Sequence, residues 1–248
     1  MHTRKRGGRG MEIQLICVGY AGSTAANFNL LAPYFAGEVL FSAVEYRGRG
    51  RRVRDGGYAD NGELVRDVAG QIKELRRGEV PYAILGYSMG AQVVYELFAQ
   101  GLLEENPLCI FLAAHEPPDV PCAGKEIDLG DGEAFLERVI KYGGMDLRLL
   151  QDARFADVFL ARMRGDFRLL QEYKFSGVYH KFPARVIVFY CEEDTPYHIV
   201  GGWQRFSQEE ILFFPIGNSH FFFRTDTEEF CGIIKQQLKK SLFELGSF

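Results

Sequence analysis

The sequence contains no apolar run that approaches 18 residues, the length expected of a membrane-spanning helix. Its first ten residues include four basic side chains and no apolar segment, so they do not resemble a secretory signal peptide. We expect residues 1–10 to form a disordered basic tail, or to precede the true start, with the folded chain beginning near Met11. These absences predict a cytoplasmic protein that does not interact with a membrane.

Patterns typical of metal and nucleotide sites are also missing. The five cysteines are scattered, and no two have the C-x-x-C spacing of a zinc or redox site. Neither a G-x-G-x-x-G fingerprint nor a Walker lysine occurs. We therefore expect reduced thiols, no metal and no cofactor. The formal net charge of −4 gives no indication of a nucleic-acid partner.

The 248 residues are 47% hydrophobic and 25% charged, which is typical of one large globular domain or a domain with an insertion. Apolar segments alternate with helical patterns, as in a mostly parallel α/β sheet. Several of these segments lack polar alternation, as expected for strands buried on both faces. We predict strands at 13–18, 38–44, 82–85, 108–114, 184–191 and 211–215, and helices at 24–35, 61–77, 92–99, 197–206 and 227–245.

The alternation stops between two predicted strands. Residues 117–180 contain no strand-like run, but they include helical patterns at 133–142 and 155–175. A segment of this length is rarely structureless within a compact domain. We predict that it forms a helical cap on a core made of residues 11–116 and 181–248, and that the protein is a monomer.

The strand at 82–85 leads into Gly-x-Ser-x-Gly at residues 86–90, and a helical pattern follows. A serine between strand and helix at this spacing indicates a nucleophile elbow, in which a strained turn exposes the hydroxyl. Gly86 and Gly90 avoid side chains where strand and helix approach each other. Ser88 is therefore the candidate nucleophile.

A serine hydroxyl needs a histidine to accept its proton and a carboxylate to orient that histidine. His220 follows the last predicted strand, where the base of an α/β-hydrolase is found, whereas the other four histidines fit less well. Three acids follow the preceding strand, at residues 192–194. We predict Asp194 as the orienting acid, because the loop has turned outward there, with Glu193 as the alternative.

Two backbone N–H groups should stabilise the oxyanion formed during such a reaction. One belongs to Met89, directly after the nucleophile. The other should come from the loop after the first strand, where residues 20–22 are Tyr-Ala-Gly, and we predict Ala21 as that donor.

These motifs resemble the type II, or editing, thioesterases of nonribosomal peptide and polyketide synthesis, which are α/β-hydrolases. The resemblance spans residues 13–245 and includes a cap-helix signature that separates this family from other hydrolases. The matching segments are residues 20–22, 48–52, 86–91, 164–173 and 220–222. Departures from the family pattern, such as Gly19 and residues 115–118, remove no catalytic group and concern the choice of acyl chain.

The resemblance implies hydrolysis of acyl or aminoacyl thioesters from the phosphopantetheine arm of a carrier protein, which would be the partner. The alternatives are a small-molecule carboxylesterase or lipase, and a carrier-binding module without activity. The arginine-rich loop at residues 47–54 is either a solvated loop or a contact for a phosphate or an acidic carrier surface.

Overall fold

A six-stranded parallel sheet forms the centre of the molecule, in a computed structural model that describes residues 12–120, 128–130, 132–142 and 153–246. The strand order is β2-β1-β3-β4-β5-β6, and every neighbouring pair is parallel. The strands are β1 (Ile13–Val18), β2 (Val39–Ala43), β3 (Tyr82–Tyr87), β4 (Cys109–Ala113), β5 (Arg185–Tyr190) and β6 (Leu212–Pro215). The predicted mostly parallel sheet is therefore confirmed.

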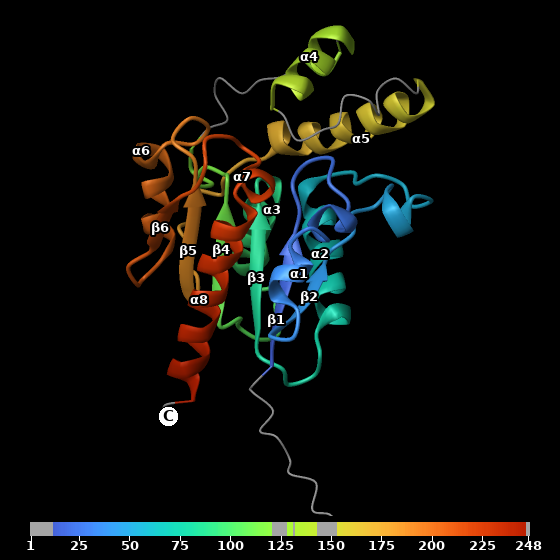
Figure 1. Cartoon of the computed structure of the whole chain (residues 1–248). Coiled ribbons are helices and arrows are strands. Elements are labelled where there is room, and N and C mark those ends of the chain that lie inside the picture. Colours follow the sequence, from blue (N-terminus) through green and yellow to red (C-terminus); the bar gives the residue numbers. More distant parts are fainter. Residues whose placement is uncertain (1–11, 121–127, 131, 143–152, 247–248) are drawn as a thin grey trace, which may run out of the picture.

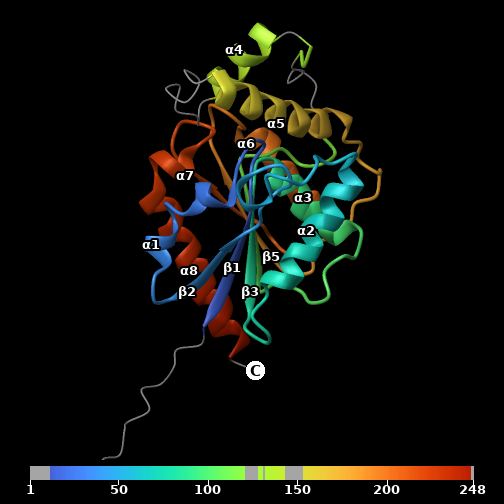
Figure 2. The same cartoon turned by 90° about the vertical axis from the view of Figure 1, so that its right-hand side faces the viewer.

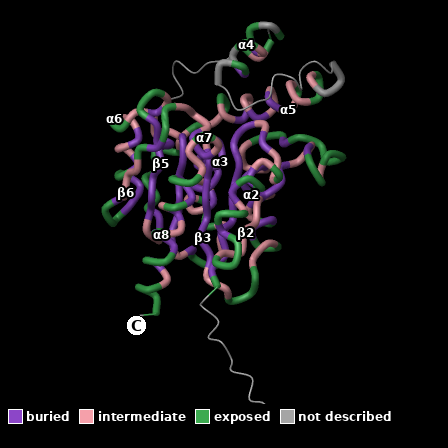
Figure 3. The backbone as a smooth tube through the Cα atoms, viewed as in Figure 1, coloured by how far each residue is buried: buried purple, intermediate pink, exposed green. Residues whose placement is uncertain are grey.

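Helices cover both faces of this sheet, as Figures 1 and 2 show. On one face, α2 (Asn61–Leu75) and α3 (Met89–Ala99) pack against the strands together with Trp203. On the other face lie α1 (Ala32–Phe35), α7 (Phe222–Thr225) and α8 (Thr227–Leu245). Figure 3 shows the buried strands between these two layers. This burial on both faces explains why the strands lack polar alternation.

Two predicted helices are wrong in detail. The expected helix at 24–35 is two short segments, the 3₁₀ turn η1 (Ala25–Phe28) and α1. Pro33 lies near the end of the predicted span, in the first turn of α1, where its missing N–H needs no helical acceptor, so the chain starts a new helix there. The expected helix at 197–206 divides into α6 (Tyr197–Val200) and the 3₁₀ helix η4 (Gly201–Phe206), beginning at a Gly-Gly pair that disfavours α-helix.

The segment between β4 and β5 contains α4 (Gly132–Tyr142) and α5 (Ala153–Glu172). Figure 1 shows both helices beyond the carboxyl ends of the strands. They share a small apolar cluster built around Phe135, Val139 and Met163. The cap boundaries at 117 and 180 remain a prediction, and part of that span lies outside the described residues, as does the predicted tail at 1–10.

Hydrogen bonds attach α5 to the core beneath it. The Asn61 side chain donates to the Leu169 carbonyl at 2.7 Å, and the Arg168 guanidinium donates to the carbonyls of Tyr58 and Ala59. All three of these core residues lie at or just before the start of α2. These bonds hold α5 over the start of α2.

Four of the five cysteines, at 17, 109, 191 and 231, are buried free thiols, and Cys122 lies outside the described residues. Within the described ranges, no helix is long and apolar enough to cross a membrane.

Gly90 tests how tightly α3 packs against the sheet. A Cβ there would overlap the Val18 carbonyl oxygen, and this backbone cannot move cheaply. We expect Gly90→Ala to lower the free energy of unfolding by about 3 kcal/mol or more, measured by urea denaturation. Gly70→Ala is the matched control, because a Cβ at this α2 position meets nothing within 4 Å. That variant should gain about 0.5–1 kcal/mol, and equal stability of the two variants would contradict the close approach.

Candidate active site

Ser88 occupies a sharp turn between β3 and α3. Its φ of 53° lies in the left-handed region, which is costly for a residue with a side chain. The Ser88 N–H donates to the Ala113 carbonyl of neighbouring β4 at 2.8 Å, which helps to hold this conformation. A Cβ on Gly86 would lie only 2.6 Å from the Gly90 carbonyl oxygen, so both glycines permit the turn. The serine is only partly buried, as a nucleophile must be to meet a substrate.

His220 and Asp194 meet Ser88 from two distant parts of the chain. His220 Nε2 lies 3.1 Å from Ser88 Oγ, and His220 Nδ1 lies 2.7 Å from Asp194 Oδ2. Their side chains are 11% and 15% exposed, so the pair is shielded without being sealed off. An ionised Asp194 accepts the Nδ1–H and leaves Nε2 free to accept the serine proton, which is the arrangement that nucleophilic catalysis requires.

The turn after β5 distinguishes between the two candidate acids. The N–H groups of Asp194 and Thr195 both donate to the Cys191 carbonyl, and this tight turn points the Asp194 carboxylate toward His220. Thr195 Oγ1 donates to the same carboxylate at 2.9 Å. Glu193 instead accepts a hydrogen bond from Cys191 Sγ. The structure therefore brings Asp194, and not Glu193, to the histidine.

The remaining described histidines have other surroundings. His115 Nδ1 lies 2.7 Å from the Glu116 carbonyl oxygen, and the His115 carbonyl accepts a hydrogen bond from Trp203 Nε1. His180 and His198 are exposed. Only His220 contacts the serine within the described part of the chain.

Tyr87 forms a hydrogen bond with the backbone of His220, a contact that was not predicted from the sequence. Its hydroxyl donates to the His220 carbonyl at 2.6 Å, and its ring packs against Phe222 and Phe223. Burial raises the pKa of Tyr87 well above its usual value, so the hydroxyl stays protonated and donates. The available signal was an aromatic residue inside the Gly-x-Ser-x-Gly motif, whose side chain must point to the opposite face from Ser88.

The turn after β1 lies next to the elbow because β1 pairs with β3, with Val18 opposite Gly86. The Ser23 N–H donates to the Tyr20 carbonyl at 3.0 Å, and Gly22 has a φ of 81°, as the third residue of a type II turn requires. Among the described residues, no acceptor bonds to the Ala21 N–H. This donor is thus available in the turn beside the elbow, as the predicted oxyanion donor must be.

Arg224 and Phe221 contact Tyr20, the first residue of this turn. Arg224, on α7 just after His220, donates from its guanidinium to the Tyr20 hydroxyl at 2.6 Å and lies over the Tyr20 ring. The Tyr20 ring also packs against Phe221, with centroids 5.1 Å apart. The turn and the histidine loop therefore share one aromatic cluster.

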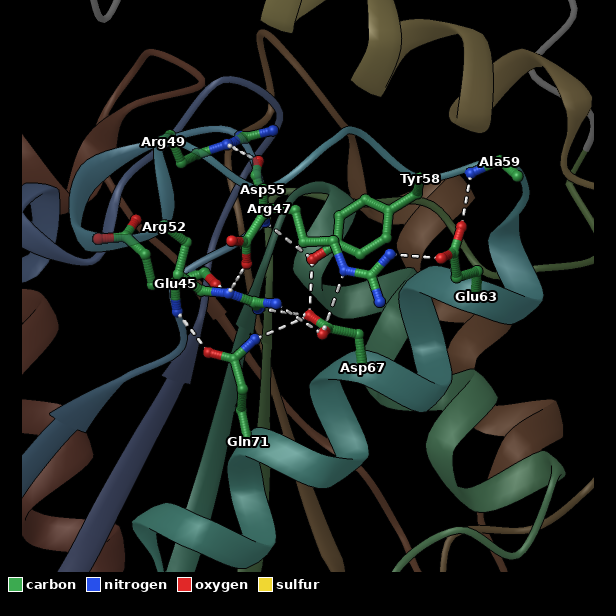
Figure 4. Close-up of polar contacts among 10 residues, drawn as sticks. All are labelled: Glu45, Arg47, Arg49, Arg52, Asp55, Tyr58, Ala59, Glu63, Asp67 and Gln71. Carbon is green, nitrogen blue, oxygen red and sulfur yellow. Dashed lines mark hydrogen bonds and ion pairs between the residues drawn. The ribbon is translucent and has the colours of Figure 1, made fainter.

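Most of the arginine-rich loop at 47–54 is neutralised within the protein, as Figure 4 shows. Arg52 makes two hydrogen bonds to Asp67 on α2, at 2.7 and 2.9 Å, and Arg47 pairs with Glu63 and Asp67. The Asp67 carboxylate accepts further bonds from Tyr58 and Gln71. Arg47 and Arg52 are thus paired within the protein, and among the arginines of the loop only Arg51 and Arg54 are exposed.

Within the described residues, no three side chains of histidine, cysteine, aspartate or glutamate gather in a way that would hold a metal ion.

Comparisons with known proteins agree with this architecture. The family model described as "Thioesterase domain" matches residues 13–238. The gramicidin S biosynthesis protein GrsT of Aneurinibacillus migulanus is 26% identical, over 92% of this chain and 90% of that protein. The thioesterase PikA5 of Streptomyces venezuelae is 23% identical, over 91% of this chain and 81% of that protein. The predicted resemblance to thioesterases of peptide and polyketide synthesis is confirmed at this level.

Solved structures show the same fold. ClbQ, from the colibactin pathway, superposes with a TM-score of 0.80 at 23% identity, covering 94% of this chain and 99% of that one. The RedJ thioesterase of the prodiginine pathway in Streptomyces coelicolor has a TM-score of 0.78 at 24% identity, covering 90% and 84% of the two chains. The predicted α/β-hydrolase fold is confirmed.

The two acids after β5 should differ sharply in their effect on Ser88. We expect Asp194→Asn to slow the labelling of Ser88 by a fluorophosphonate by roughly 10³–10⁴-fold, because the histidine loses the acceptor that orients it. The matched control, Glu193→Gln, should change the labelling rate by about twofold at most, since it only alters a contact with Cys191. Equal rates for the two variants would contradict the assignment.

Asp67 should make the loop's contribution to stability depend on pH. Burial alone would raise its pKa, but hydrogen bonds from Arg52 and Tyr58 outweigh burial and lower the pKa. A lowered pKa means that the stabilisation is present above the unfolded value of about 3.9 and is lost as the pH falls through the folded value. We expect Asp67→Asn to cost about 1–3 kcal/mol at pH 7, and the difference from the unmodified protein to shrink below about pH 4.

Urea denaturation across this pH range measures the effect of Asp67→Asn. The control is Asp55→Asn, which removes a more exposed partner of the same Arg52 and should cost less than about 1 kcal/mol. A cost for Asp67→Asn that stays constant down to pH 3 would show that the charge of the carboxylate is not the cause.

Proposed function

Because the chain belongs to the thioesterase domain family, we propose that it hydrolyses acyl or aminoacyl thioesters carried on the phosphopantetheine arm of a carrier protein. Such a reaction would release acyl groups during nonribosomal peptide or polyketide synthesis. The observation that carries the proposal is the contact of His220 with both Ser88 and Asp194, beside a turn with an available N–H donor. Relatives named for gramicidin S biosynthesis and as the thioesterase PikA5 support the choice of substrate class.

In the first step, His220 Nε2 takes the proton of Ser88 as Oγ attacks the thioester carbonyl carbon. The carbonyl oxygen becomes an oxyanion, which the N–H groups of Ala21 and Met89 stabilise. Met89 begins α3, so its N–H lies at the positive end of the helix dipole. When the tetrahedral intermediate collapses, the carbon–sulfur bond breaks and the pantetheine thiolate leaves with the proton held by His220.

In the second step, water replaces the thiol. His220 accepts a proton from the water as its oxygen attacks the acyl-serine, and a second oxyanion forms in the same place. Collapse of this intermediate releases the free acid and returns the proton to Ser88 Oγ. Asp194 stays ionised throughout and stabilises the imidazolium that forms in each step.

This reaction requires only protein groups and water, and the phosphopantetheine belongs to the carrier protein. The carrier is accordingly the proposed partner. We retain the monomeric state and the cytoplasmic location as predictions that belong to this proposal.

We expect Ser88→Ala to lower kcat for an acyl-carrier thioester by about 10⁵-fold or more, because no other group can form the acyl intermediate. The measurement is the release of free acid from a loaded carrier domain, with circular dichroism to show that the variant is folded. Residual hydrolysis within tenfold of the unmodified protein would refute the role of Ser88.

Substrate class is tested by a second comparison. We expect kcat/KM for a carrier-bound thioester to exceed kcat/KM for the oxygen ester of the same acyl group by about 10-fold or more, because the carrier adds binding energy away from the reacting carbon. A free acyl-pantetheine thioester is the control that separates the leaving group from the carrier. A preference for the oxygen ester would favour a small-molecule esterase instead.

A further inference from the structure

Asp166, on the cap helix α5, carries a buried carboxylate that contacts residues outside α5. Its residue is only 3% exposed. Its two oxygens accept from the two terminal nitrogens of Arg49, each at 2.7 Å, in a bidentate pair. Oδ2 also accepts the backbone N–H of Gly22 at 2.6 Å. One cap side chain thus contacts the turn that presents Ala21.

Arg49 is fixed almost as completely as its partner. It is 2% exposed, and besides the carboxylate it donates to the carbonyls of Ser23 and Arg47. Its guanidinium also lies over the Tyr46 ring, 5.2 Å from the centroid. The ion pair therefore links three segments that are far apart in sequence: the turn after β1, the arginine-rich loop and the cap helix.

Stability alone is a poor explanation for this pair. Removing two charges from water costs several kcal/mol per ion, and well-packed apolar residues often replace a buried ion pair without loss of stability. What an apolar pair could not supply is an acceptor for the Gly22 N–H. The contact with the turn is therefore the part of the arrangement that requires a carboxylate.

The peptide that Asp166 contacts decides the conformation of the turn. Type I and type II turns differ in the orientation of their central peptide, which here joins Ala21 to Gly22. The N–H of this peptide faces the carboxylate, whereas a flip would bring the Ala21 carbonyl oxygen toward the same negative charge. Met163, one turn earlier on α5, closes the space above Gly22, where a Cβ would overlap its sulfur.

We infer that Asp166, held by Arg49, is a positioning residue: it fixes the peptide directly after Ala21 and so holds in place the residue whose N–H is proposed to meet the oxyanion. The cap helix then completes the catalytic geometry in addition to covering it. This inference rests on the roles proposed above for Ser88 and Ala21.

The decisive variant replaces the ion pair with apolar side chains, combining Arg49→Met and Asp166→Leu. We expect it to stay folded, because neither charge is left unpaired, and to lose about 10–100-fold in kcat with KM changed less than about threefold. Asp166→Asn alone keeps an oxygen that can accept the Gly22 N–H, so its kcat should be higher than that of the double variant. It also provides the test if the apolar pair fails to fold.

Arg168→Ala is the matched control. It removes a different hydrogen-bonded contact between α5 and the core, with the carbonyls of Tyr58 and Ala59, and does not touch the turn. Its kcat should stay within about twofold of the unmodified protein. If the Asp166 variants lose no more kcat than Arg168→Ala, or if their loss lies in KM alone, the inference is wrong.

A second readout separates this inference from the proposed function. Fluorophosphonate labelling of Ser88 expels fluoride and develops negative charge on a phosphoryl oxygen, which the same N–H donors stabilise, but it requires no carrier or thioester. We expect the labelling rates to fall in the same order as kcat. If the unmodified protein is labelled but hydrolyses no thioester, the proposed function fails, and the labelling rates still decide the role of Asp166.

Discussion

The close approach of α3 to the end of β1 is the constraint on which the active site depends. Gly90 allows the first turn of the helix to lie against the carbonyl of Val18, with no room for a side chain between them. Since the chain turns directly after Val18, this contact places the turn at residues 20–23 beside Ser88. Ser88, the proposed nucleophile, and the predicted donor at Ala21 thus depend on one backbone contact, and a displacement of α3 would disturb both.

An aromatic cluster extends this arrangement to His220, the proposed base. Tyr87 lies one residue before the nucleophile, yet its hydroxyl bonds to the carbonyl of His220, 133 positions later. Tyr20, in the turn, packs against Tyr87 and Phe221 and is held by Arg224. These contacts couple the backbone at the nucleophile, the turn and the histidine loop. The cluster therefore holds Ser88, the turn and His220 together from the face of the sheet opposite α3.

Ion pairs of the arginine-rich loop at 47–54 also hold the turn after β1. The arginine-rich loop has a strongly basic sequence, but carboxylates on α2 and α5 neutralise Arg47, Arg49 and Arg52. Most of its charge therefore serves to fasten the loop. Arg49 extends from this loop to Asp166 on α5, and Asp166 in turn contacts Gly22. The loop, α5 and the turn after β1 are therefore connected by hydrogen bonds. The cap joins the core through defined polar contacts over the site.

Local patterns of residues were enough to predict the parallel sheet, the position of the elbow and the family to which the chain belongs. Unbroken apolar segments define buried strands, and two glycines around Ser88 define the turn. The same local patterns placed Asp194 and His220 on the loops after consecutive strands, whose carboxyl ends must lie at one edge.

Which acid faces His220, and what the loop arginines bind, depends instead on contacts between distant segments. Glu193 and Asp194 are adjacent carboxylates, and they differ through a turn whose direction depends on hydrogen bonds to Cys191. Arg49 and Asp166 are 117 positions apart, so nothing in either local sequence indicates the pairing. Long-range contacts of this kind arise from the packing of whole elements, which a local pattern of residues does not specify.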